Sequence, residues 1–241
     1  MSYILHLETA TDVCSVALSQ VKEDLPQLAE PITVAECTEP RKHSEELLPL
    51  ICSVIKKAGI GFNDLAAVAV SRGPGSYTGL RIGVSTAKGI CFALNIPLIS
   101  VDTMLSLALG AKVILKGRDG ILCPMLDARR MEVYCGFYDF GGFPLETVKA
   151  EIIEPDFISK RRTGRHITAD FFLFGDGAEK SKSMLKLQPG VEFVENFKVS
   201  ASALVAPAFE KFKAKEFEST AHFEPYYLKE FMATVARDPL R

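Results

Sequence analysis

The sequence predicts an α/β protein made of two similar halves, in which mixed sheets are flanked by helices. The first observation is that residues 1–101 open on alternating strands and continue as strand, helix and strand. The second is that one pattern recurs at residues 121–140: a strand, an acid-led turn (a turn that begins with an acidic residue) and a second strand. The two halves are expected to face each other across a cleft. Chance resemblance between two hairpins is the alternative explanation of the repeat.

The first half contains both alternating and continuous apolar strands. Alternation in "SYILHLETATDVCSVALSQ" predicts two strands joined by a Thr-Ala-Thr-Asp turn, and "ITVAEC" adds a third. The continuous apolar run "LAAVAVS" is typical of a strand buried on both faces. The strands are expected to end near Glu8, Ser19, Cys37, Ser71 and Val101.

Two amphipathic helices are expected in the same half. In "KHSEELLPLICSVIKKAG" apolar residues recur at steps of three and four, with Ser44 suited to the start and Gly59 to the stop. A second helix is expected over residues 80–94. Asp102 is suited to cap a third helix.

The second half begins with "ILCPMLDARRMEVYCGFYDF", again a strand, an acid-led turn and a strand. "FFLFGDGAEK" then predicts a strand and a turn that lead into a short helix, and residues 201–215 form the last helix. The predicted division places the first half in residues 1–101 and the second, smaller half in 102–241. The helix at 201–215 is expected to pack back on the first half.

A glycine turn, "VSRGPGSYTGLRIGVSTAKGI", suggests a phosphate cradle between a strand and a helix. The dinucleotide fingerprint fails because Thr78 occupies the position of its third glycine. The P-loop fails because Gly79 is followed by Leu80 and Arg81 instead of Lys and Ser or Thr. A tight turn, in which glycines allow close backbone approach, is therefore the preferred interpretation.

Composition excludes several classes of protein. The chain of 241 residues has 28 basic and 30 acidic side chains, so it lacks the basic footprint of a protein that binds RNA alone. The short basic run at residues 160–165 is expected to be a solvated loop. Neither a signal pattern nor an apolar stretch of membrane-spanning length is seen, so a cytoplasmic protein without membrane contact is expected. The six cysteines form no C-x-x-C pair and are expected to be buried and reduced, since several of them, such as Cys52 and Cys91, lie in apolar runs.

Five motifs resemble one family along nearly the whole chain and in the same order. They are the glycine turn, "KHSEELLP", "LDARRMEVY", "GDGA" and "PYYL". On these motifs the chain is similar to the TsaB family, also called YeaZ. The resemblance implies two actin-like halves of the ASKHA type. It also implies a non-catalytic subunit of the bacterial machinery that forms threonylcarbamoyladenosine in tRNA.

The resemblance also implies partners. These are the catalytic paralogue TsaD, which is the transferase, and TsaE, a P-loop ATPase. The isolated chain would be a homodimer, tRNA would be reached only through the complex, and ATP and metal would belong to the partner subunits. In the paralogue a His-x-x-x-His metal site follows the next strand, and its two positions fall here on Thr103 and Leu107. Since neither residue replaces an imidazole ligand, no metal site and no catalytic residue are assigned.

The nucleotide site of actin-like proteins is also altered. Their opening hairpin carries Asp-x-Gly-Thr/Ser, whereas this chain has Glu8 followed by Thr9, Ala10 and Thr11, which adds a methyl group where glycine is needed. The turn at Asp127 also lacks glycine, and the GDG turn either borders a remnant of the cleft or simply turns a strand into a helix. The positions that would remain of a nucleotide cleft are Glu8, Thr9, Gly73, Gly75, Asp127, Gly175 and Gly177.

The first two helices are the predicted interaction surface. Leu48 and Cys52 lie beside the main apolar stripe of the first helix, and the second helix carries small residues at four-residue steps. The resemblance implies that the family pairs with itself or with its paralogue through these helices. Packing within the chain is the alternative for part of the small-residue stripe. The predicted interface residues are His43, Leu47, Leu48, Ile51, Cys52, Gly79, Arg81, Gly83 and Ala87.

Two other functions are considered. A glycoprotease-like peptidase would use His43 or Ser44, although adjacency in sequence is not a triad geometry and no G-x-S-x-G elbow occurs. A stand-alone actin-like ATPase would turn over ATP without a partner. Cleavage or ATP turnover by the purified chain would distinguish these from a partner subunit.

Overall fold

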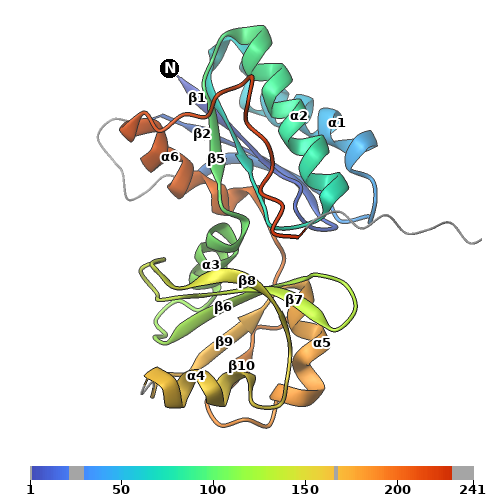
Figure 1. Ribbon diagram of the computed structural model, residues 1–241. Coiled ribbons are helices and arrows are strands. Elements are labelled where there is room, and N and C mark those ends of the chain that lie inside the picture. The colour runs from blue at the N-terminus through green and yellow to red at the C-terminus, as the bar shows by residue number, and fades with distance from the viewer. Residues whose placement is uncertain (1, 22–29, 166–167, 230–241) are drawn as a thin grey trace, which may run out of the picture.

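Two five-stranded mixed sheets, one in each half of the molecule, organise the chain in the computed structural model (Figure 1). The structure describes residues 2–21, 30–165 and 168–229. The sheets have the strand orders β3-β2-β1-β4-β5 and β8-β7-β6-β9-β10. In each, an antiparallel three-stranded meander is followed by two parallel strands. The two-lobed α/β fold expected from the repeated hairpin is thereby confirmed.

The first half runs from β1 to β5. Its elements are β1 (Tyr3–Glu8), β2 (Cys14–Gln20), β3 (Pro31–Cys37), α1 (His43–Ala58), η2 (Phe62–Asp64), β4 (Leu65–Ser71), α2 (Tyr77–Leu94) and β5 (Leu98–Val101). Side chains alternate across β1, so Leu5 and Leu7 pack under α1 and α2, whereas Ile4 faces the opposite layer.

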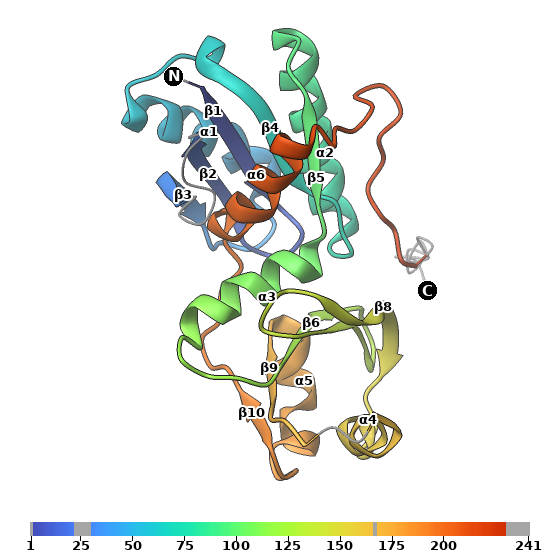
Figure 2. The ribbon, with the colours of Figure 1, turned by 90° about the vertical axis from the view of Figure 1, so that its left-hand side faces the viewer.

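The second half begins with a helix. Its elements are α3 (Thr103–Ile114), β6 (Ile121–Asp127), β7 (Glu132–Tyr138), β8 (Pro144–Ile152), α4 (Phe157–Arg165), β9 (Phe171–Phe174), α5 (Asp176–Leu185) and β10 (Val191–Phe193). Helix α3 packs on one face of this sheet against Leu122 and Phe172, while α4 and α5 cover the other. Figure 2 shows α3 lying between the two sheets.

After β10 the chain returns to the first half. The 3₁₀ helix η3 (Ala201–Leu204) and helix α6 (Val205–Ala214) pack on the face of the first sheet opposite α1 and α2. The Ser15 hydroxyl accepts a hydrogen bond of 2.8 Å from the backbone N–H of Ala201. The division of the chain at residues 101 and 102 stays a prediction. Among the described helices, none combines the length and the apolar character needed to cross a bilayer.

Some local expectations were wrong. Helix α2 begins at Tyr77 rather than Leu80, because the Ser76 hydroxyl accepts a hydrogen bond of 3.3 Å from the N–H of Gly79 and caps the helix. The basic run at 160–165 lies in α4 and is not a loop. Cys52 is exposed, whereas Cys91 is buried. The sequence patterns also missed β8 and β10, which are short or partly exposed.

Arg161 anchors the basic run to the core of the second half, with only 9% of its side chain exposed. Its guanidinium lies 4.2 Å from the ring centres of both Phe137 and Phe157. It also forms ion pairs with Glu146 at 3.3 Å and Glu151 at 2.5 Å. Burial disfavours the charged form of Glu151, but Lys149 and Arg161 outweigh it and the net pKa of the carboxyl is lowered. One face of this short charged helix is therefore part of the core.

Candidate functional site: the first hairpin, the glycine turn and the α1–α2 face

The acid of the first hairpin is buried. Alternation along β1 and β4 directs Glu8 and Ser71 to the same side of the sheet. The Glu8 Oε1 atom accepts hydrogen bonds from the Ala10 N–H at 2.8 Å and from the Ser71 hydroxyl at 2.9 Å. Its Oε2 atom has no partner among the described residues. Burial is the main cause that raises the pKa of Glu8 to about 7, although these hydrogen bonds oppose it.

The glycine turn is filled by the same chain. A Cβ atom built on Gly75 would lie 2.4 Å from the carbonyl oxygen of Ala10, and one on Gly73 would lie 2.5 Å from that of Tyr226. The Ala10 oxygen also accepts a hydrogen bond of 2.7 Å from the Ser76 N–H. The glycines thus allow two other backbone segments to come close, in accord with the tight-turn interpretation.

The small-residue stripe of α2 also faces inward. A Cβ atom on Gly79 would lie 2.1 Å from the Thr9 carbonyl oxygen, and one on Gly83 would lie 2.2 Å from Thr9 Oγ1. Ala87 is fully buried beneath the same helix. Direct contact of these three residues with another chain, which the interface prediction included, is therefore wrong in this structure. They hold the first hairpin against α2 instead.

In the second half the corresponding turn follows β9. A Cβ atom on Gly175 would lie 2.2 Å from the Met125 oxygen, and one on Gly177 would lie 2.7 Å from the carbonyl carbon of Leu126. The Asp176 Oδ1 atom accepts a hydrogen bond of 2.9 Å from the N–H of Asp127. These glycines again allow a helix to pack closely on a strand.

Carboxylates and one lysine gather at this second turn. Burial raises the pKa of Asp176, and the charges of Asp127 and of Asp12 in the first hairpin act in the same direction. Lys180 forms an ion pair with Asp127 and donates a hydrogen bond of 2.9 Å to the Arg130 carbonyl oxygen. The predicted cleft residues are therefore brought together as two groups, one at each acid-led hairpin.

Groups of the chain itself occupy the positions next to the glycines of the first turn and at the paralogue's metal pair. Ala10 fills the approach to Gly75, and the N–H of Gly73 is already bonded to the Thr103 hydroxyl at 3.1 Å. Leu107, the other position of the paralogue's metal pair, lies in the core under the second sheet. Among the residues with defined positions, no group of three or more His, Cys, Asp or Glu side chains could hold a metal ion.

Neither His43 nor His6 is placed like the base of a serine peptidase. The His43 ring nitrogen lies 3.3 Å from the Val13 carbonyl oxygen, so it is engaged by the backbone. His6 does bond to the Ser19 hydroxyl at 2.8 Å, but both side chains are buried and burial lowers the pKa of His6 to about 3. This pair is inaccessible to a peptide and is a poor base.

The predicted interface residues on α1 and α2 fall into two groups, buried and exposed. His43, Leu47 and Ile51 are buried within the first half. Leu48 is 59% exposed, and Cys52 and Arg81 are also exposed. Leu48, Cys52 and Arg81 are therefore the predicted residues available to a partner. Phe92, which is 84% exposed near the end of α2, was missed because a lone aromatic residue gives no periodic signal.

The C-terminal strap, defined as residues 216–229, was also missed. Its Glu218 N–H donates to the Leu98 carbonyl oxygen at 2.8 Å, and its Tyr226 N–H donates to the Arg72 oxygen at 2.7 Å. Figure 1 shows this segment, in red, running along α2 toward the second half. Lys229 ends the strap with an ion pair to Glu132 on β7. The "PYYL" motif marked the segment, but no local pattern reveals where an irregular strap lies.

Comparison with known proteins gives a consistent set of relatives. Residues 38–235 match the family model "TsaD: tRNA N6-adenosine threonylcarbamoyltransferase". The TsaB tRNA threonylcarbamoyladenosine biosynthesis protein of Escherichia coli strain K12 is 29% identical over 95% of this chain and 96% of that protein. The protein of the same name from Bacillus subtilis strain 168 is 35% identical over 60% of this chain and 58% of that protein.

Solved structures with a similar fold include a protein of the same family. YeaZ from Pseudomonas aeruginosa has a TM-score of 0.74 and 27% identity, covering 95% of this chain and all of that one. Component A of the (R)-2-hydroxyglutaryl-CoA dehydratase of Acidaminococcus fermentans has a TM-score of 0.53 over 90% of this chain and all of that one. At 11% identity the second likeness shows the fold alone.

Proposed function

This chain belongs to the TsaB (YeaZ) family, and on that premise we propose that it is a non-catalytic partner subunit for tRNA N6-threonylcarbamoyladenosine synthesis. A role in the synthesis of this modified nucleoside is supported by the names of its relatives. The finer proposal is that the chain binds and supports a TsaD-like transferase. A homodimer would use the same surface when the transferase is absent.

One observation carries this proposal: apolar side chains are exposed on α1 and α2, while the glycines of the predicted phosphate turn pack against the chain's own backbone. Leu48 is 59% exposed on α1, and Phe92 is 84% exposed on α2. At the glycine turn, Ala10 and Tyr226 take the space next to Gly75 and Gly73. A chain with these features is suited to binding another protein through its helices.

The remaining parts of the machinery follow as proposals. ATP and metal would be bound by the partner subunits, and this chain would need neither on its own. A TsaE-like P-loop ATPase would join the complex, and tRNA would be contacted only through the complex. The balance of 28 basic and 30 acidic residues supports this last point, since a protein that holds RNA alone usually presents a basic surface.

The test is Leu48→Glu, assayed by pull-down with the organism's TsaD-like protein and by light scattering of the isolated chain. The substitution places a charge where close apolar contact is proposed, and an unpaired charge buried in an interface typically costs several kcal/mol. We expect both associations to be lost while circular dichroism shows an intact fold, because more than half of the Leu48 side chain is exposed.

Leu187→Glu is the matched control. Leu187 is 91% exposed in the second half, so the same change of residue at this position should leave both associations as in the wild type. If Leu48→Glu also leaves them intact, α1 is not the interface and the proposed surface is wrong. If the wild-type chain fails to bind the transferase, the partner role itself is wrong.

A further inference from the structure

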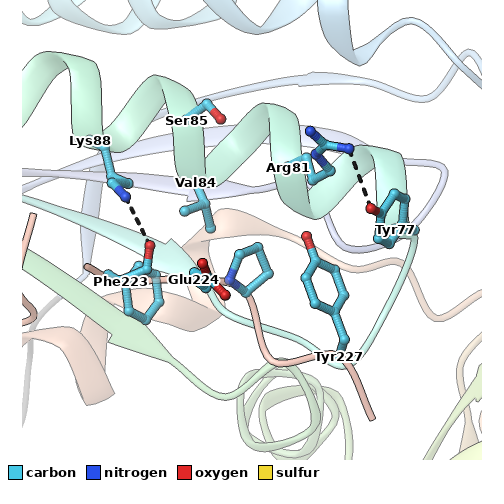
Figure 3. A pocket seen from close by; sticks show the side chains of 9 residues that line it. Tyr77, Arg81, Val84, Ser85, Lys88, Phe223, Glu224 and Tyr227 are labelled. Atoms are coloured by element: carbon cyan, nitrogen blue, oxygen red, sulfur yellow. Dashed lines mark hydrogen bonds between the residues drawn. The ribbon is translucent and has the colours of Figure 1, made fainter. Parts of the chain in front are cut away.

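A polar cavity of about 320 Å³ lies between α2 and the C-terminal strap. One wall is formed by α2, from which Tyr77, Arg81, Ser85 and Lys88 project at intervals of about one helical turn. The strap forms the opposite wall with Phe223, Glu224, Pro225 and Tyr227. Figure 3 shows the Tyr227 ring rising from the strap toward α2, with its hydroxyl group directed at the helix. The rings of Tyr77 and Tyr227 pack together with their centres 4.9 Å apart.

The strap is held in place by the helix itself. The Lys88 ammonium group donates hydrogen bonds to the carbonyl oxygens of Phe223 at 2.9 Å and Ala221 at 3.3 Å. The Tyr226 N–H donates to the Arg72 carbonyl oxygen, which anchors the next part of the strap. The cavity is thus formed by two fixed walls.

The cationic groups of the cavity lack carboxylate partners. The ion pairs within the described part of the chain include neither Arg81 nor Lys88. Arg81 instead contacts Tyr77, with one N–H 3.3 Å from the hydroxyl and the guanidinium 5.5 Å from the ring centre. Burial is the first cause that raises the pKa of Tyr227, so its hydroxyl stays protonated and can donate a hydrogen bond. Glu224 supplies the lining's single acidic group among the described residues.

We propose that this cavity receives a carboxylate side chain of the protein partner that docks on α1 and α2. The planar guanidinium of Arg81 can bond both oxygens of a carboxylate, and the Tyr227 hydroxyl adds a further donor. This inference rests on the proposed function, since it names the chemistry by which the same partner is recognised.

The position of the cavity favours a protein over RNA or a free anion. Along α2, Arg81, Ser85 and Phe92 fall on one exposed stripe. Phe92 lies eleven residues, or about 16 Å, beyond Arg81 at 1.5 Å per residue. A partner helix with a carboxylate at one end and an apolar contact at the other matches this stripe. The acidic balance of the whole chain does not favour an RNA phosphate.

The test is Arg81→Glu, with the affinity for the TsaD-like transferase measured by calorimetry at low and high salt. We expect at least a tenfold loss of affinity, and the salt dependence of the wild-type complex should become flat or change sign. Arg81→Lys should retain part of the affinity, since it keeps the charge but not the planar pair of donors. Tyr227→Phe should give a smaller loss with unchanged thermal stability.

Lys112→Glu is the control, because this exposed lysine on α3 gives the same change of net charge away from the cavity. It should bind as the wild type does. If Arg81→Glu binds the transferase normally while Leu48→Glu does not, the carboxylate site is wrong and the partner role stands. If Arg81→Glu weakens only binding to tRNA, the site recognises phosphate and the inference is overturned. If the wild-type chain binds no transferase, both proposals fall.

Discussion

Thr9 lies directly against Gly83: a Cβ atom built on this glycine would fall 2.2 Å from Thr9 Oγ1. The contact joins the turn after β1 to the second turn of α2. Gly79 makes a similar approach to the Thr9 carbonyl oxygen, so two glycines four residues apart admit the hairpin. The small-residue stripe therefore serves internal packing, while partner binding is left to the exposed residues of the same helix.

Gly83→Ala is expected to destabilise the chain. The new methyl group would overlap Thr9, and overpacking of a tight core typically costs about 1–3 kcal/mol. Gly89→Ala in the same helix is the control, since a Cβ atom there meets nothing within 4 Å. It should stabilise by about 0.5–1 kcal/mol through helix propensity. Urea unfolding of both variants measures the difference, and equal stabilities would contradict this packing.

A Thr9→Ala substitution should relieve much of that overlap. The Thr9 Oγ1 atom is buried without a hydrogen-bond partner among the described residues, so its removal costs little hydrogen-bond energy. In the double variant, the nearest remaining Thr9 side-chain atom is the Cβ atom, 3.3 Å from the position that the new methyl group would take. We expect a favourable coupling free energy of about 1 kcal/mol between the two sites. Strictly additive effects in the double-mutant cycle would exclude direct contact.

Glu8→Gln is expected to change how stability depends on pH. The pKa of Glu8 rises from 4.5 to about 7 on folding, so the folded state holds a proton that the unfolded state has released. The wild type therefore loses stability as the pH rises from 4.5 to 7, by at most about 3 kcal/mol.

Glutamine has no such proton to lose. The melting temperature of the Glu8→Gln variant, relative to that of the wild type, should be higher at pH 8 than at pH 4.5. Thermal melts across this range measure the effect, with Glu39→Gln on an exposed loop as the control. A Glu8→Gln curve parallel to that of the wild type would mean that Glu8 is ionised in the folded state at pH 6.

Arg161→Ala is expected to destabilise the second half. It removes a cation that packs over the rings of both Phe137 and Phe157 and is paired with Glu146 and Glu151. Removing one partner of a buried ion pair typically costs about 3–5 kcal/mol. The cost here should be toward the lower end of that range, because Lys149 still pairs with both carboxylates. Lys160→Ala removes a neighbouring cation that is paired only at the surface, so it should change the stability little. Chemical denaturation compares the two, and similar losses would show that Arg161 is not part of the core.

The purified chain is expected to hydrolyse ATP negligibly and to hold no stoichiometric metal. Ala10 crowds the glycine turn, while Thr103 and Leu107 stand at the paralogue's metal-ligand positions. Phosphate release and elemental analysis measure these properties, with the TsaD-like protein as the reference. Steady turnover by the clean chain, or one equivalent of zinc or iron, would overturn the expectation.

The sequence alone determined the elements that depend on local patterns. Alternation located β1 and β2, the spacing of apolar residues located α1, and the acid-led turns at Glu8 and Asp127 indicated the duplication. These features could be read because a strand or an amphipathic helix repeats its burial over a few residues, whatever lies beyond it.

Only the tertiary structure decided which side of each element is covered, and by what. Gly83 could equally have faced a partner chain or Thr9, since a stripe of small residues allows close approach by either. From the sequence, Arg161 is expected to be a solvated charge. In the fold it contacts Phe137, Glu146 and Glu151, which lie up to 24 residues away along the chain. The strap is held beside the glycine turn by backbone hydrogen bonds, and these produce no periodic pattern in the sequence. Such contacts join segments far apart along the chain, so their energies depend on the complete fold and not on any local window of the sequence.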